Sequence, residues 1–448
     1  MQRLFTKRRS TLLLIMLSGL ALHQIAFAAT GDDSHGGGVL NVLLELIVIL
    51  LAAKLGGDLF ERVGQPAVLG ELILGMLIGN AHLIGITAFQ SFGSNVTLEI
   101  LAEIGVIILL FEVGLESTVR EMRQVGGTSL LVATLGVVVP FALGWGVSFL
   151  FLPEESKFVH AFIGATLCAT SVGITARVLK DIGKTNSKEA RIILGAAVID
   201  DVMGLVILAI VAGIISAAST GAGAISALAI VWIIAKALLF ILGAIVIGQW
   251  LLPHYFKLAF RVRGKGVFLS FALLVCFGLA YVAGKIGLAP IVGAFAAGLI
   301  YDRVNYQEFE EREQHTMEEL ISPIAIFLVP IFFVRMGMLV DLTTFGEVGI
   351  LGFAAVLTIA AIIGKQACSL GVWDKTTNRI AIGLGMIPRG EVGLIFAGIG
   401  AKLMIDSHPV ISPSTYSAVV IMVIVTTLVT PPLLKWSLMR QPKDGNEL

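Results

Sequence analysis

The stretch Ile192-Ile-Leu-Gly-Ala-Ala-Val-Ile-Asp-Asp-Val-Met-Gly-Leu-Val206 is apolar throughout, except for two adjacent aspartates, Asp200 and Asp201. In a helix predicted over 190–213, a rise of ~1.5 Å per residue places the pair roughly 15 Å deep, near the middle of a bilayer. A charge at that depth costs at least ~2.5–3.5 kcal/mol and needs a partner, water or a function. No helix end lies nearby for the aspartates to cap. The stretch therefore predicts a functional site inside a membrane-spanning helix.

The composition of the whole chain agrees with a protein made of many such helices. The 448 residues are 57% hydrophobic and 14% charged, whereas a soluble domain carries roughly 25% charged residues. At about 20 residues per span, we predict an all-α polytopic membrane protein with about 13 transmembrane helices. The predicted ranges are 38–60, 66–85, 98–115, 126–152, 159–181, 190–213, 223–251, 268–287, 288–302, 320–341, 347–370, 378–402 and 412–437.

Basic residues in the predicted loops indicate the orientation, because cytoplasmic loops carry an excess of lysine and arginine. With the mature N-terminus outside, 18 basic residues fall in the inside loops, against Lys157, Lys285 and Lys402 in the outside loops. We therefore predict a protein of the bacterial inner (cytoplasmic) membrane with its C-terminus in the cytoplasm.

The N-terminus has the features of a secretory signal. Basic residues precede the short apolar run Thr11–Leu22, and Ala26-Phe27-Ala28 fits a cleavage site. We predict a signal peptide over 1–28, with an uncleaved first helix as the alternative. The short tail after 437 predicts no attached regulatory domain. The zero net charge gives no reason to expect a nucleic-acid partner, and the expected partner is the lipid bilayer.

The chemistry of the aspartate pair suits ion exchange. Adjacent helical positions point ~100° apart, so the two carboxylates can serve different partners. They can hold protons or a small hard cation, which prefers oxygen ligands, and mutually exclusive occupancy is the physical basis of antiport. The transported ions would be Na+ (or Li+, K+) and H+. We predict no cofactor and no enzyme activity, and the widely spaced Cys168, Cys276 and Cys368 predict buried packing residues.

Other polar groups fall at membrane depth. Lys365 lies inside the predicted span 347–370 and is either neutral or paired, with snorkelling to the interface as the alternative. Thr170, Ser171 and Gly173 favour a local break in the span 159–181. Unwound backbone at this depth is tolerable only where it lines a cavity.

A second break is predicted in Gly383-Leu-Gly-Met-Ile-Pro-Arg-Gly-Glu-Val-Gly393. Its proline and four glycines interrupt the helix beside Arg389 and Glu391, which we predict to be supporting residues of the site. An ordinary proline-kinked helix is the alternative.

The chain also shows a weak internal symmetry. Two consecutive segments recur in the same order: Pro66–Gly70 with Gly75 beside Pro290–Gly293 with Gly298, and Phe111–Gly114 beside Phe333–Gly337. In the predicted topology the copies run in opposite directions, which is typical of inverted-repeat transporters with a site at the midplane. Chance similarity of glycine-rich apolar helices is the alternative.

Six motifs in one order carry a family resemblance. They are Gln65-Pro66 with Gly70-Glu71, Leu110–Glu116, Thr170–Thr175, Asp200-Asp201, Gly364-Lys365 and Pro388–Gly393. The chain resembles the second family of monovalent cation:proton antiporters from residue 38 to about 437, and most of all its bacterial sodium/proton antiporters.

The resemblance implies roles for the site residues. Asp201 would be the principal carboxylate for sodium and protons, with Asp200 as its partner in the sodium site. Asp200 would pair with Lys365 when no sodium is bound. Thr170 and Ser171 would lie where two broken helices cross.

The resemblance also implies a domain organisation. A dimerisation domain would comprise 38–115 and 268–341, and a core transport domain 126–213 and 347–437, with 223–251 as a linker helix. The protein would be a homodimer whose core moves like an elevator. Members with two adjacent aspartates typically exchange two protons for one sodium ion, which is electrogenic and serves pH homeostasis.

Arg335 departs from the family, in which this position is usually uncharged. By the internal symmetry it is equivalent to Glu112. We hypothesise that Glu112 and Arg335 pair in the part that does not move. The alternative is that Arg335 faces the ion path.

Three rival functions remain at this point. A potassium/proton antiporter or potassium-efflux protein of the same family is the first, because carboxylates alone do not rank the alkali cations. A sodium-coupled solute symporter is less favoured, because it has no use for Lys365. An intramembrane aspartyl protease needs two aspartates from different helices, which Asp200 and Asp201 do not provide.

Overall fold

The computed structural model describes residues 37–439 apart from 91, 117–125, 185–186, 220–226, 260, 263–265, 302–314, 375 and 406–407. The predicted signal peptide, 1–28, lies outside the described residues. The described chain is almost entirely helical, as predicted, with one short hairpin of β1 (Met404–Ile405) and β2 (His408–Pro409).

Eight helices of the described residues are long and apolar enough to cross a membrane. They are α2 (Gly37–Arg62), α6 (Gly127–Phe151), α9 (Lys188–Ser219), α10 (Ala227–Ala259), α11 (Val267–Lys285), α14 (Met317–Met338), α15 (Val348–Gln366) and α18 (Pro413–Met439). This confirms a polytopic all-α membrane protein.

The remaining predicted ranges coincide with shorter or more polar helices. These are α3 (Ala67–Gly79), α4 (Val96–Glu116), α7 (Lys157–Thr166), α8 (Val172–Asp181), α12 (Pro290–Ile300), α16 (Arg379–Gly385) and α17 (Gly390–Lys402). Short 3-10 turns are η1 (Ala81–Ile84), η2 (Phe92–Ser94), η4 (Leu342–Gly346) and η5 (Ala367–Gly371). Helix length and hydropathy do not by themselves establish 13 crossings, so that number stays a prediction.

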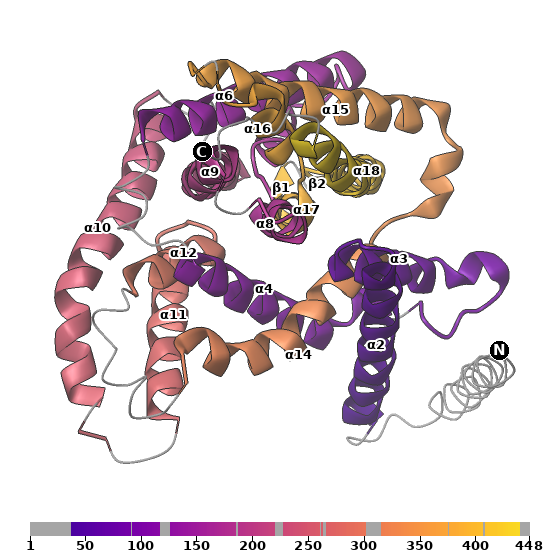
Figure 1. Ribbon diagram of the computed structural model, residues 1–448. Coiled ribbons are helices and arrows are strands. Elements are labelled where there is room, and N and C mark those ends of the chain that lie inside the picture. Colours follow the sequence, from indigo (N-terminus) through magenta and orange to yellow (C-terminus); the bar gives the residue numbers. More distant parts are fainter. Residues whose placement is uncertain are drawn as a thin grey trace, which may run out of the picture.

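The helices pack in two groups, which Figure 1 shows one above the other. Group A consists of α2, α3, α4, α11, α12 and α14. Group B consists of α6, α7, α8, α9, α15, α16, α17 and α18. The long helix α10 runs along one edge and contacts α9, α11 and α12.

Glycines let the helix backbones of group A approach closely. A Cβ at Gly75 of α3 would lie 2.0 Å from the Val334 carbonyl oxygen of α14, and one at Gly298 of α12 would lie 2.4 Å from the Phe111 carbonyl oxygen of α4. Only glycine fits such contacts. Gly75 and Gly298 are the glycines that recur in the sequence, and each packs on the second segment of the other copy.

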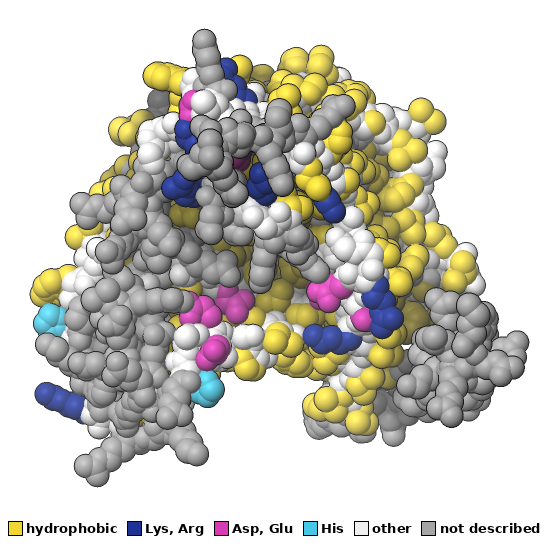
Figure 2. Space-filling view, viewed as in Figure 1, with side chains coloured by type: hydrophobic (Ala, Val, Ile, Leu, Met, Phe, Trp, Pro, Cys, Tyr) yellow, Lys and Arg dark blue, Asp and Glu magenta, His cyan; other side chains and the backbone are white. Residues whose placement is uncertain are grey.

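Hydrophobic and charged side chains lie on different parts of the molecular surface. Helix α10 exposes Trp232, Val246 and Trp250 on its outer surface. Figure 2 shows hydrophobic side chains around the periphery, while described charged side chains gather across the face toward the viewer. This is the distribution expected of a protein surrounded by lipid.

Candidate functional site

Two helix breaks lie in group B. The first, residues 167–171, separates α7 from α8, and the second, residues 386–389, separates α16 from α17. Pro388 accounts for the second, because proline has no N–H to donate and disfavours helical backbone at the preceding residue. Gly390 follows with a φ of 41°, in the left-handed region that favours glycine.

The two breaks contact each other through their backbones. The N–H of Ser171 donates to the Pro388 carbonyl over 2.7 Å, and the Thr170 hydroxyl donates to the Met386 carbonyl over 3.3 Å. A Cβ at Gly390 would lie 2.5 Å from the Ser171 side chain. Thr170 and Ser171 therefore lie where the broken helices meet, as the resemblance implied.

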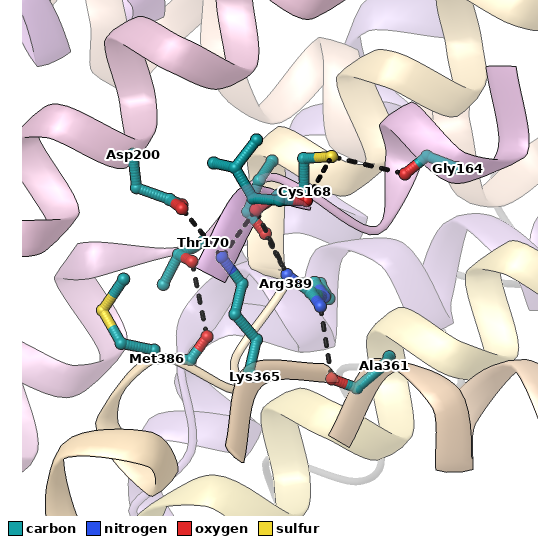
Figure 3. A network of polar contacts seen from close by, with 10 residues as sticks. Gly164, Cys168, Thr170, Asp200, Ala361, Lys365, Met386 and Arg389 are labelled. Carbon is teal, nitrogen blue, oxygen red and sulfur yellow. Dashed lines mark hydrogen bonds and ion pairs between the residues drawn. The ribbon is translucent and has the colours of Figure 1, made fainter. Parts of the chain in front are cut away.

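A fully buried ion pair lies beside this meeting point. Lys365 Nζ of α15 lies 2.9 Å from Asp200 Oδ1 of α9, and both side chains are 0% exposed. Figure 3 shows the lysine between Asp200 and the first break, where its ammonium also donates to the Cys168 carbonyl over 2.7 Å. The expected Lys365–Asp200 pair is present, and snorkelling to the interface is excluded for Lys365.

Arg389 supplies a second buried cation. Its Nη1 donates to the Ala169 carbonyl over 2.6 Å and to the Cys168 carbonyl over 3.4 Å, and its Nη2 donates to the Ala361 carbonyl over 3.3 Å. The carbonyls at the end of α7 have no helical partner of their own, and cations are favoured at a helix C-terminus. Arg389 and Lys365 thus neutralise the partial negative charge that the first break creates.

The second aspartate is buried as well, and its exposed fraction differs slightly from its neighbour's. Asp201 is 8% exposed, whereas Asp200 is 0% exposed. Since successive residues point ~100° apart on a helix, Lys365 occupies the direction of Asp200 and leaves Asp201 to face another side of α9. The Oδ2 atom of Asp200 has no hydrogen-bond partner among the described residues.

The predicted supporting residues fall in different places. Arg389 belongs to the site, and the side chain of Glu391 lies outside the described residues. The hypothesised pair of Glu112 with Arg335 is wrong. Arg335 Nη2 lies 3.3 Å from Glu99 Oε2, and Glu99 and Glu112 are roughly 20 Å apart along α4 at ~1.5 Å per residue.

Three further features of the site were not singled out from the sequence, although Thr175 ends the motif Thr170–Thr175. The Cys168 and Ala169 carbonyls are backbone groups, which any residue type carries. The Thr175 hydroxyl donates to the Gly385 carbonyl over 2.6 Å and so adds a second side-chain link between the breaks. A Cβ at Gly136 of α6 would lie 3.3 Å from Lys365 Nζ, so this glycine leaves room for the ion pair.

The cysteines and the other possible metal-ligating side chains indicate which ions the site can hold. All three cysteines are free and buried, as predicted. Among the described residues no three His, Cys, Asp or Glu side chains converge as a metal cluster would require. The site instead has two carboxylates, two cations and unwound backbone, which can hold protons or one small monovalent cation.

Comparisons with known proteins agree with this chemistry. The family described as "Sodium/hydrogen exchanger, transmembrane" matches residues 46–440. The chain is 39% identical to the high-affinity Na+/H+ antiporter NhaS3 of Synechocystis sp., over 88% of this chain and 89% of that protein. It is 36% identical to the Na+/H+-K+ antiporter GerN of Bacillus cereus, over 88% of this chain and 95% of that protein.

A solved structure shares the fold. The sodium proton antiporter MjNhaP1 from Methanocaldococcus jannaschii superposes with a TM-score of 0.68 at 17% identity, over 90% of this chain and 100% of that one. At this identity the likeness concerns the helix arrangement alone.

Proposed function

This chain belongs to the sodium/hydrogen exchanger family, and from that premise we propose that it is an electrogenic sodium (or lithium)/proton antiporter. Sodium and protons compete for Asp201 and Asp200. The observation that carries the proposal is the Lys365–Asp200 pair, which is completely buried beside two helix breaks. A buried ion pair is a costly way to gain stability, so its position at unwound backbone favours an ion-handling role.

The proposed exchange follows from competition between cations. Asp200 is held by Lys365 when no sodium is present. A sodium ion that reaches Asp201 also attracts Asp200, and it displaces the lysine from that carboxylate. While Asp200 pairs with Lys365, Asp201 carries a proton. The arriving sodium ion displaces that proton, and the displaced Lys365 ammonium, buried without its carboxylate, releases a second proton. Protonation of Asp201 and Lys365 reverses the exchange. Release of two protons for each sodium ion makes the exchange electrogenic.

We further propose that group B is the core transport domain, group A the dimerisation domain of a homodimer, and α10 the linker. Each group contains contacts in which helix backbones approach closely, and in group B a Cβ at Gly164 would lie 2.8 Å from the Phe141 carbonyl oxygen. Between the groups, a Cβ at Gly398 of α17 would lie 2.9 Å from the sulfur of the Met336 side chain of α14. Flexible side chains permit sliding better than interlocked backbones, which supports an elevator motion.

The proposed topology keeps 13 crossings and an inverted repeat, with the mature N-terminus outside. In that arrangement α2, α3 and α4 form one copy, and α11, α12 and α14 form the other. The reciprocal glycine contacts of Gly75 and Gly298 support equivalent positions for the two copies.

Exchange in proteoliposomes tests the function. With an imposed proton gradient, sodium and lithium are expected to release protons, and Asp201→Asn is expected to reduce this release to that of empty liposomes. The matched control is Asp374→Asn, which alters an exposed aspartate of group B and leaves exchange intact. Sodium-dependent proton release that survives in Asp201→Asn would contradict the site.

Potassium exchange is the second candidate, because the relative GerN is a Na+/H+-K+ antiporter. Proton release is therefore measured with sodium, lithium and potassium in turn. Release by potassium alone would favour this candidate. The same measurement with the membrane potential free or clamped tests electrogenicity, since an electroneutral exchanger runs equally fast under both conditions.

A further inference from the structure

A cavity of about 380 Å³ lies between the two helix groups, away from the aspartates. Group A contributes Val106 of α4 and Phe332 of α14 to its wall, and group B contributes Ala212 of α9 and Ile395 of α17. Its lining is mostly apolar, and its charged residues come from α4, α14 and the end of α17. In the proposed topology this is the extracytoplasmic end of the protein.

Four charged side chains form a cluster at this cavity. Arg335 Nη2 lies 3.3 Å from Glu99 Oε2, and Lys402 Nζ lies 2.7 Å from Glu99 Oε1. Lys402 also pairs with Glu103. Glu99, Glu103 and Arg335 all belong to group A, whereas Lys402 is the last residue of α17 in group B. The lysine therefore reaches from one group to the other.

The two cations of the cluster differ in their freedom to move. Arg335 is buried, with a side chain 5% exposed, and it also donates to the Gly93 carbonyl over 3.3 Å. These contacts hold Glu99 in a fixed orientation. Lys402 is 37% exposed and Glu103 is 57% exposed, so water can replace the contacts of the lysine. One half of the cluster is fixed and the other half is easily released.

We propose that Lys402, docked on Glu99 and Glu103, is an ionic latch that holds group B against group A at this end of the molecule. The inference rests on the proposed function, because α17 has to slide past α4 when the core moves. Each transport cycle then breaks and remakes the latch. The Tyr416 hydroxyl, which donates to the Met336 carbonyl over 2.9 Å, is a neutral contact across the same interface and remains when the latch is removed.

The strength of the latch suits repeated release. Partly exposed pairs contribute little, because water and salt screen both charges. Removal of Lys402 is therefore expected to raise the population with this end open by roughly two- to tenfold. A pair as buried as Lys365–Asp200 would instead lock the two groups together.

Thiol labelling in proteoliposomes measures that population. Ala102→Cys places a reporter on the cavity wall, where the native alanine is 2% exposed. A membrane-impermeant maleimide reaches it only when the end opens, and the parent protein with its three buried cysteines provides the blank. Lys402→Ala is expected to speed labelling roughly two- to tenfold. Glu103→Gln removes one of the two carboxylates of the lysine and leaves Glu99 paired with the buried Arg335, so it is expected to speed labelling less, and not at all in the Lys402→Ala background.

The matched control is Lys285→Ala. Lys285 is also an exposed lysine in the last turn of its helix, α11, but it lies over the Tyr281 ring. Its removal is expected to leave labelling of the reporter unchanged. Equal labelling rates in the parent and Lys402→Ala proteins would overturn the latch.

A cross-link tests whether the latch has to open. Lys402→Cys/Glu103→Cys joined by a short bis-methanethiosulfonate, which forms a reducible disulfide with each thiol and releases methanesulfinate, is expected to stop sodium-dependent proton release, which returns on reduction. Exchange that continues in fully cross-linked protein would also overturn the proposal. Without a cross-link, Lys402→Ala is expected to keep exchanging sodium for protons. A parent protein that shows no exchange would contradict the proposed function, whereas the labelling experiment would still test the latch.

Discussion

Two lysine–carboxylate contacts of this protein differ in their access to water. Lys365 and Asp200 lie inside group B, and both side chains are 0% exposed. Lys402 and Glu99 lie between the groups, and their side chains are 37% and 32% exposed. The atoms are 2.9 Å apart in the first pair and 2.7 Å apart in the second, so distance does not distinguish them.

The difference in water access assigns different tasks to the two pairs. Breaking a buried pair leaves a charge that neither water nor protein compensates, so Lys365 leaves Asp200 only when another cation takes its place. That is the requirement of an ion-exchange site. An exposed pair opens at little cost because water solvates both halves, which is the requirement of a contact that opens in every cycle.

The largest expected effect comes from breaking the buried pair on one side. Lys365→Met leaves Asp200 buried without its cation and is expected to lower the free energy of unfolding by ~3–5 kcal/mol. Thermal unfolding of the purified protein in detergent measures the change. Lys365→Met/Asp200→Asn removes both charges and is expected to recover most of the stability while exchange stays impaired. If the double variant is no more stable than Lys365→Met, the lysine does not stabilise the protein by neutralising Asp200.

The contrast between the pairs also explains what the sequence could predict. Asp200, Asp201 and Lys365 were predictable because a charge within a long apolar run is unusual wherever the chain folds. Pro388 and its glycines likewise predicted a helix break from local backbone chemistry. These signals need no knowledge of the neighbours in space.

The cluster at the interface gave no such signal. Glu99 and Lys402 lie near helix ends, where charges are ordinary, and Lys402 was predicted only as a residue of an outside loop. Arg335 was predicted to pair with Glu112 because the two residues hold equivalent positions in the repeated motifs. Equivalent positions in a repeat need not lie at the same level where the two helices pack. The carboxylate that Arg335 meets depends on how α14 crosses α4, which is a property of the packed structure.

A smaller effect is expected from crowding the buried pair without removing a charge. A Cβ at Gly136 would lie 2.8 Å from Cys368 Sγ and 3.3 Å from Lys365 Nζ, so Gly136→Ala displaces the lysine and is expected to cost ~1–3 kcal/mol of stability. Gly146 lies on the same helix, α6, with no atom within 4 Å of its added Cβ. Gly146→Ala is expected to stabilise the helix by up to ~1 kcal/mol.

Thermal unfolding and sodium-dependent proton release are measured for both glycine variants. Slower exchange is expected for Gly136→Ala alone. Equal behaviour of the two variants would mean that the space around the pair does not matter.

The smallest effect is expected from a third lysine–carboxylate pair, Lys188 with Asp374, which is exposed but lies wholly within group B. The hydrogen bond from Lys188 is the main cause that holds the pKa of Asp374 below its ordinary value of 3.8, followed by bonds from Thr376. A carboxylate with a lowered pKa stabilises the folded state above its ordinary pKa, and this contribution is lost as the pH falls through the folded value. Lys188→Ala should therefore lower stability slightly at pH 7, where this contribution of an exposed pair is fully present but small, and move acid unfolding to slightly higher pH.

The same variant tests whether the position of Lys402, and not its charge, makes the latch. Lys188 and Lys402 are both exposed and both pair with carboxylates. The pair of Lys402 links group B to group A, whereas the pair of Lys188 lies within group B. Lys188→Ala is therefore expected to leave maleimide labelling of the Ala102→Cys reporter at the parent rate, while Lys402→Ala speeds it. If both variants speed labelling equally, the loss of any exposed lysine opens this end, and the position of Lys402 between the groups does not matter. The buried pair and the Lys402 pair would then differ only in solvent exposure, and Lys402 would not be a latch.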